Sequence, residues 1–118
     1  MKKKIYITDD DPGVQDIFKI IFENAGYETT VYHNGKELLE TKDSYPDIYI
    51  LDKQLSGMDG LDICRNLKSN SNTRNIPIII VSATPDLGVL AKAAGADDFI
   101  EKPFRKVDLL DMVARHLE

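Results

Sequence analysis

Short apolar runs alternate along the chain with longer segments in which apolar residues recur every three or four positions. The short runs predict strands at Lys4–Thr8, Glu28–Tyr32, Ile48–Leu51, Ile78–Val81 and Asp98–Glu101. Helical spacing between and after them is carried by Val14 to Ala25, Leu38 and Leu39, Ile63 to Leu67, Leu87 to Ala94, and Val107 to Leu117. Gly26 and Gly95 stand where the first and fourth of these helices should end.

Strict alternation of strands and helices is typical of an α/β protein with a parallel sheet, right-handed crossovers and helices on both faces. Polar residues stand at expected helix starts: Asp11, Asn34, Asp59 and Asp86. No repeat, low-complexity tract or internal boundary interrupts the pattern. We therefore expect one domain over residues 1–118.

The residues that follow each predicted strand carry the chemistry. Parallel strands deliver their carboxyl ends to one edge of a sheet, where ligands bind in open α/β folds. Four of the five strands bring acids, a hydroxyl or a lysine to that edge: Asp9, Asp10 and Asp11, then Asp52, Ser82, and Lys102-Pro103. The second strand ends in Tyr32-His33-Asn34. This favours a doubly wound, flavodoxin-like sheet of order 2-1-3-4-5, with the first and third strands adjacent.

Convergence of Asp9, Asp10 and Asp52 would crowd negative charge. Two like charges 4 Å apart repel by roughly 4 kcal/mol at an effective dielectric near 20. Such a cluster responds by raising a pKa, by pairing with a cation, or by both. Lys102 supplies one positive charge. Mg²⁺ suits the site because it prefers oxygen ligands, keeps several waters, and is often bound by only one or two carboxylates together with a phosphate.

Asp52 is then the candidate nucleophile of a phosphoryl transfer, because carboxylates form aspartyl phosphates. Such a transfer needs mainly positioning and neutralisation of the phosphoryl oxygens. Mg²⁺, the Lys102 ammonium and the Ser82 hydroxyl could each serve one oxygen.

Composition narrows the function further. The net charge of −5 argues against nucleic-acid binding by this domain. No apolar stretch reaches the ~20 residues that a membrane span needs. Cys64 is the only cysteine, which excludes an intrachain disulfide and fits a cytoplasmic protein, and its spacing from Leu61 and Leu67 indicates a buried core thiol.

These residues together resemble the receiver domain of two-component response regulators, from Ile5 to the last helix. The matching motifs are Asp9-Asp10, Asp52 with Gly57-Met58-Asp59-Gly60, Ser82-Ala83, Gly95-Ala96-Asp97-Asp98, and Lys102-Pro103-Phe104. The resemblance implies a signalling switch, not a metabolic enzyme. It also implies a sensor histidine kinase or phosphotransfer protein as partner, an unidentified downstream target protein, and a monomer or a phosphorylation-dependent dimer.

The resemblance also implies residue roles. Asp52 accepts the phosphoryl group, Asp10, Asp52 and the Gln54 carbonyl ligate Mg²⁺, and Asp9 acts through water. Lys102, Ser82 and the Ala83 N–H hold phosphoryl oxygens. Ser82 and Phe99 move as a switch that repacks the face of the fourth helix, fifth strand and fifth helix. Gln54 and Thr84 tune the phosphoryl lifetime. Lys102-Pro103 is expected to be cis.

Some positions depart from the commonest family pattern. Ser56 replaces a frequent proline, Lys53 directly follows the acceptor, and Thr8 replaces an aliphatic residue. The segment from Thr84 to Gly95 predicts a brief fourth helix.

Two other functions share parts of this pattern. A Mg²⁺-dependent phosphatase with an aspartyl nucleophile generally has a second acid two residues later, where this chain has Gln54. A flavodoxin-like FMN carrier should have a Ser, Thr and Gly-rich loop where this chain has acids. A stand-alone regulator and a domain of a larger regulator or hybrid kinase look alike in this sequence.

Overall fold

The computed structural model describes residues 2–55 and 57–118, so the expectation for Ser56 lies outside the described residues. Five strands form one parallel sheet in the order β2-β1-β3-β4-β5, as predicted. They are β1 (Lys4–Thr8), β2 (Glu28–Tyr32), β3 (Ile48–Asp52), β4 (Ile78–Ser82) and β5 (Asp98–Glu101). β3 and β4 each extend one residue beyond the prediction, because backbone pairing continues through Asp52 and Ser82. The polar residues that end these strands are therefore held by the sheet itself.

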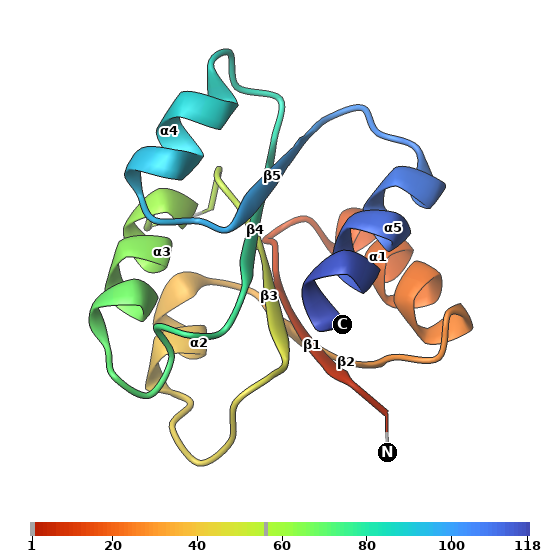
Figure 1. Cartoon of the computed structure of the whole chain (residues 1–118), viewed down its shortest axis with the longest axis horizontal. Helices are drawn as coiled ribbons and strands as arrows, with labels where there is room; N and C mark the ends of the chain where they lie inside the picture. Colours follow the sequence, from red (N-terminus) through yellow and green to blue (C-terminus); the bar gives the residue numbers. More distant parts are fainter. Residues whose placement is uncertain (1, 56) are drawn as a thin grey trace.

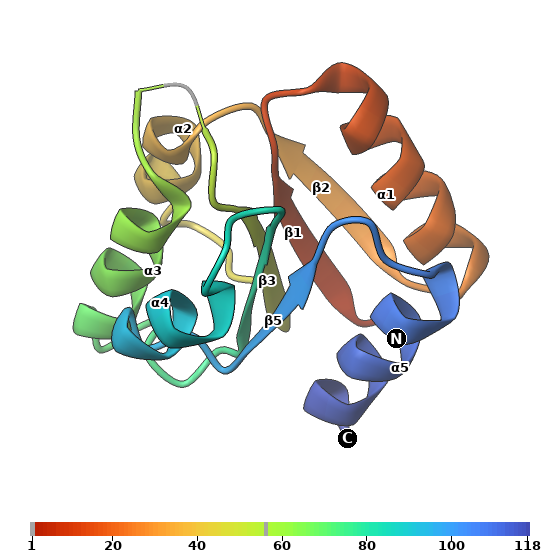
Figure 2. The same ribbon diagram turned by 90° about the horizontal axis from the view of Figure 1, so that it is seen from above.

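Helices cover both faces of the sheet. They are α1 (Pro12–Asn24), α2 (Gly35–Glu40), α3 (Gly60–Ser69), α4 (Leu87–Ala93) and α5 (Lys106–Leu117). α1 and α5 lie on one face, and α2, α3 and α4 lie on the other (Figure 1, Figure 2). α4 is brief, as expected, with seven residues.

Capping explains where several helices begin. Asp11 Oδ1 accepts a hydrogen bond from Gly13 N at 2.8 Å, and Asn34 Oδ1 accepts one from Glu37 N at 2.8 Å. Asp86 precedes α4 as expected, but its backbone is left-handed with φ 58° and its side chain makes no capping bond. α4 thus begins at a turn of the chain without help from a side-chain cap.

Alternation along the strands divides the core into two layers. Ile7, Ile50 and Ile79 pack toward α1 and α5, while Tyr49, Leu51 and Ile80 pack toward α2, α3 and α4. Cys64 is fully buried in the second layer, and burial raises the pKa of its thiol to about 11, which confirms the prediction of a core thiol. None of the described helices has the length and apolar character that crossing a membrane requires.

Candidate functional site

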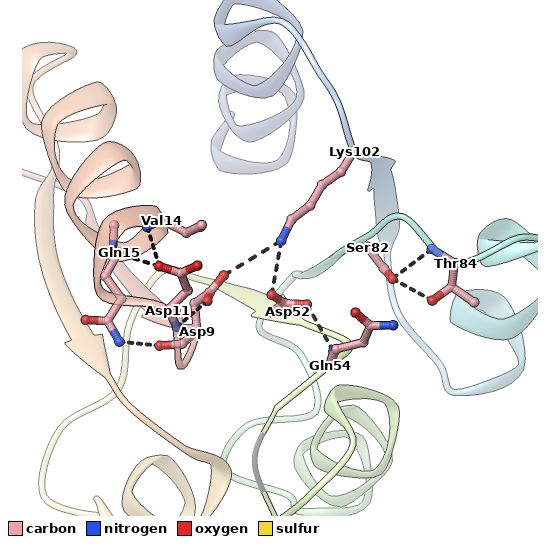
Figure 3. Close-up of polar contacts among 10 residues, drawn as sticks. Asp9, Asp11, Val14, Gln15, Asp52, Gln54, Ser82, Thr84 and Lys102 are labelled. Carbon is pink, nitrogen blue, oxygen red and sulfur yellow. Dashed lines mark hydrogen bonds and ion pairs between the residues drawn. The ribbon is translucent and has the colours of Figure 1, made fainter.

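Asp9, Asp52 and Lys102 meet at the carboxyl edge of the sheet, as the sequence predicts. Lys102 Nζ lies 3.1 Å from Asp52 Oδ2 and 4.0 Å from Asp9 Oδ2. Figure 3 shows both carboxylates directed toward this ammonium from different strand ends. Residues far apart in sequence are therefore brought into one electrostatic cluster by the sheet order.

Asp52 is held on both carboxylate oxygens. Oδ2 accepts a hydrogen bond from Lys102 Nζ at 3.1 Å, and Oδ1 accepts one from Gln54 N at 2.9 Å. The residue is only 8% exposed and ends β3, which is flanked by β1 and β4. This confines the carboxylate to one orientation at the sheet edge.

Asp9 is the more deeply buried acid, with 1% of its surface exposed. Oδ1 accepts a hydrogen bond from Asp11 N at 2.9 Å, whereas Oδ2 is buried without a hydrogen-bond partner among the described residues. Burial raises the pKa of Asp9 to about 7; the Asp11 N–H lowers it, the Asp52 carboxylate raises it and Lys102 lowers it. The crowding of acids was predicted to raise a pKa, and it does, although burial is the larger cause.

Gln15 contacts the backbone of the acidic residues that follow β1, and this contact was not predicted from the sequence. Its Nε2 donates to the Asp9 carbonyl oxygen and lies 3.1 Å from His33 Nδ1. Gln15 is buried although it is polar. A signal was available, because Gln15 shares a helical face with Phe18 and Phe22, and a buried polar group there needs partners.

Ser82 and Thr84 form a second polar group beside this cluster. The Ser82 hydroxyl lies 2.7 Å from Thr84 Oγ1 and accepts a hydrogen bond from Thr84 N at 3.0 Å (Figure 3). Ser82 is therefore engaged by Thr84 in this conformation. Ala83 lines a cavity of about 560 Å³ together with Lys102.

Phe99 is not part of this cluster. Its half-buried ring packs with the layer under α3 and α4. A Cβ atom added to Gly88 would lie 2.9 Å from Phe99 Cζ, so the ring lies directly against the first turn of α4. The Lys102-Pro103 bond is cis, as expected.

The structure also places Lys53 and Thr8, the two other residues that depart from the commonest family pattern. Lys53 is turned toward Asp59, with Nζ 3.0 Å from Oδ2. Thr8 is fully buried, and its hydroxyl has no hydrogen-bond partner among residues 2–55 and 57–118.

The carboxylates at this edge of the sheet have the right chemistry for a divalent cation, but their side chains are not arranged as a complete set of metal ligands. Within the described part of the chain, no three Asp, Glu, His or Cys side chains stand ready as a metal cluster, so the expected convergence of Asp9, Asp10 and Asp52 is not complete. Asp10 is exposed, unlike Asp9. Nevertheless the donors are hard oxygens, and Asp9 Oδ2 is a buried carboxylate oxygen that lacks a hydrogen-bond donor. These residues fit Mg²⁺.

Comparison with known proteins identifies the family to which the chain belongs. The response regulator receiver domain model matches residues 5–114. The DNA-binding response regulator MtrA of Mycolicibacterium smegmatis is 34% identical over 120 residues, which cover 99% of this chain and 51% of that protein. The response regulator MprA of Mycobacterium ulcerans is 34% identical, over 93% of this chain and 48% of that protein. The chain thus spans about half the length of these relatives.

Solved structures show the same architecture. The receiver domain of a histidine kinase from Syntrophus aciditrophicus has a TM-score of 0.92 and 36% identity, covering 98% of this chain and 89% of that one. The chemotaxis regulator CheY4 of Vibrio cholerae has a TM-score of 0.90 and 25% identity, covering 99% and 100%. The fold is therefore a doubly wound, flavodoxin-like α/β sheet. This chain belongs to the response regulator receiver family of two-component systems.

The raised pKa of Asp9 predicts a stability profile. Between pH 4 and 7 the unfolded chain has already released this proton while the folded chain retains it, so raising the pH lowers the free energy of unfolding. In metal-free buffer we expect Asp9→Asn to flatten this fall, and to be more stable than wild type at pH 8 by at least about 1 kcal/mol. Urea unfolding of both proteins at pH 5 and pH 8 measures it.

Asp16→Asn is the matched control, because Asp16 is exposed on α1. It should keep the wild-type profile. Parallel pH profiles for wild type and Asp9→Asn would contradict the assignment.

Proposed function

We propose that Asp52 accepts a phosphoryl group from a phosphohistidine, and that this modification changes the surface formed by α4, β5 and α5. The observation that carries the proposal is the Asp52 carboxylate at the end of a buried strand, 3.1 Å from the Lys102 ammonium and one strand away from the Ser82 hydroxyl. Receiver domains partner with histidine kinases. The donor would be a sensor kinase or a phosphotransfer protein.

The receiver domain of the sensor histidine kinase PA1611 from Pseudomonas aeruginosa has a magnesium ion coordinated in its active-site cleft. In this chain the Asp10 and Asp52 carboxylates and the Gln54 carbonyl would hold the ion directly, and Asp9 would do so through water. The buried Asp9 Oδ2, which has no hydrogen-bond donor among the described residues, supports this proposal. When bound, Mg²⁺ supplies positive charge to the phosphoryl oxygens.

The reaction itself is a displacement at phosphorus. An Asp52 carboxylate oxygen forms the new P–O bond, the P–N bond to histidine breaks, and the nitrogen keeps the electron pair. Lys102 balances charge first on the carboxylate and then on the phosphoryl group, while Ser82 and the Ala83 N–H hold its oxygens. Gln54 and Thr84 border the path of attacking water and tune the lifetime of the product.

The switch would begin at Ser82. Its hydroxyl accepts from Thr84 N and contacts Thr84 Oγ1 in this conformation, and it would turn its O–H toward a phosphoryl oxygen. Phe99 would then move inward and change how α4 packs on β5. Phosphorylation adds about 1.5–2 negative charges at neutral pH, which is enough to bias two states that differ by a few kcal/mol.

A phosphatase or a flavin carrier receives no support from a specific observation. The residue two positions after Asp52 is the amide Gln54, whose N–H is occupied by Asp52. We propose instead a cytoplasmic signalling switch, a monomer or a phosphorylation-dependent dimer, that catalyses only its own phosphorylation and dephosphorylation. Its downstream target protein would bind the surface formed by α4, β5 and α5.

Acetyl phosphate with Mg²⁺ should modify Asp52 alone. Intact-mass measurement should show one added phosphoryl group on wild type and a loss of at least about 90% of it in Asp52→Asn, because this substitution removes the carboxylate that lies 3.1 Å from Lys102 Nζ. Asp62→Asn, which removes an exposed acid of α3, should be modified like wild type. Equal modification of wild type and Asp52→Asn would refute the acceptor assignment.

Gly88→Ala should favour the inward position of Phe99. The added methyl group would overlap the ring where it now lies, so the present conformation loses stability relative to the alternative. We expect about two- to tenfold tighter binding of beryllofluoride in the presence of Mg²⁺, measured by calorimetry.

Val89→Ala is the control, because the adjacent Val89 is exposed. Its affinity should equal that of wild type. Weaker binding by Gly88→Ala would contradict the proposed direction of the Phe99 movement.

A further inference from the structure

Lys53 is the residue between the proposed acceptor Asp52 and Gln54, whose carbonyl is a proposed ligand. Its backbone is tied on both sides: Lys53 N donates to Val81 O at 3.0 Å, and Lys53 O accepts from Gly60 N at 2.8 Å. A backbone hydrogen bond therefore joins the residue after β3 to the first residue of α3.

The Lys53 side chain adds a second link. Nζ lies 3.0 Å from Asp59 Oδ2, and the two side chains are 17% and 38% exposed. The other oxygen of Asp59, Oδ1, accepts a hydrogen bond from Leu61 N at 2.8 Å. One carboxylate thus links Lys53 to the N-terminus of α3. We call this ion pair between Lys53 and Asp59 the clasp.

Gly60 allows the two ends to touch. A Cβ atom there would overlap the Asp52 carbonyl oxygen and would lie 2.9 Å from Lys53 Cα. The chain that carries Asp52 and Gln54 is therefore pressed against the start of α3. The clasp therefore lies beside the backbone that would present the Gln54 carbonyl.

We propose that the clasp positions this backbone for Mg²⁺, so that Lys53 strengthens metal binding although it is a cation. The inference rests on the proposed function. The alternative hypothesis is that Lys53 acts only as a nearby positive charge, which would repel the ion and weaken its binding. Under the alternative hypothesis, removing the charge of Lys53 strengthens Mg²⁺ binding. Under our proposal it weakens Mg²⁺ binding, because part of the binding free energy is then spent on ordering the backbone.

Calorimetric titration with MgCl₂ separates the two accounts. We expect Lys53→Met to bind Mg²⁺ about three- to tenfold more weakly than wild type, and Lys53→Arg, which keeps the ion pair, to bind like wild type. Asp59→Asn should also weaken binding while still capping α3. The double variant Lys53→Met/Asp59→Asn should lose less than the product of the two single losses, because both break the same contact.

Arg65→Met is the matched control. It removes one positive charge from α3, where Arg65 Nη1 forms an exposed ion pair with Asp62 at 2.7 Å. Its Mg²⁺ affinity should equal that of wild type or exceed it slightly. Hydrogen exchange of the Gly60 amide in metal-free protein gives an independent readout, and should be at least about threefold faster in Lys53→Met than in Arg65→Met.

Equal or tighter Mg²⁺ binding by Lys53→Met, or unchanged Gly60 exchange, overturns the clasp. A wild type that binds no Mg²⁺ overturns the proposed function and the clasp with it. The wild-type titration therefore distinguishes failure of the function from failure of this inference.

Discussion

The unequal charge at the carboxyl edge of the sheet is the constraint on which the rest depends. Two buried carboxylates, Asp9 and Asp52, face one ammonium group, that of Lys102. A buried charge without a partner is costly, and the structure meets this cost by raising the pKa of Asp9 to about 7. At neutral pH Asp9 is therefore only partly ionised, and the site still carries more negative than positive charge, which a bound divalent cation would balance.

The fold maintains this imbalance because each charged group comes from a different rigid element. Asp52 ends β3, Asp9 follows β1, and Lys102 follows β5, so the sheet fixes the backbone positions from which the three groups meet. Around them lie groups with more freedom. Ser82 is bonded to Thr84, and Phe99 rests on Gly88. A fixed charged centre surrounded by adjustable neighbours is what a two-state switch requires.

Much of this arrangement could be predicted from the sequence. Apolar runs predicted strands such as β3 and β4, and the polar residues at the strand ends favoured the observed sheet order and the meeting of Asp52 with Lys102. Some side-chain partners were harder, because they depend on the course of the backbone in the loops that follow the strands. Gln15 reaches the Asp9 carbonyl across a turn, and Lys53 turns to Asp59. Asp10 is exposed whereas Asp9 is buried, and the sequence does not distinguish these two neighbouring acids.

The most direct test of the charge imbalance is the effect of Mg²⁺ on unfolding at pH 7.5. We predict that about 10 mM MgCl₂, compared with NaCl at equal ionic strength, raises the free energy of unfolding of wild type by about 1–2 kcal/mol, because the ion binds only the folded chain. In Asp52→Asn most of this gain should disappear. An equal gain in both proteins, or none in wild type, would contradict the account.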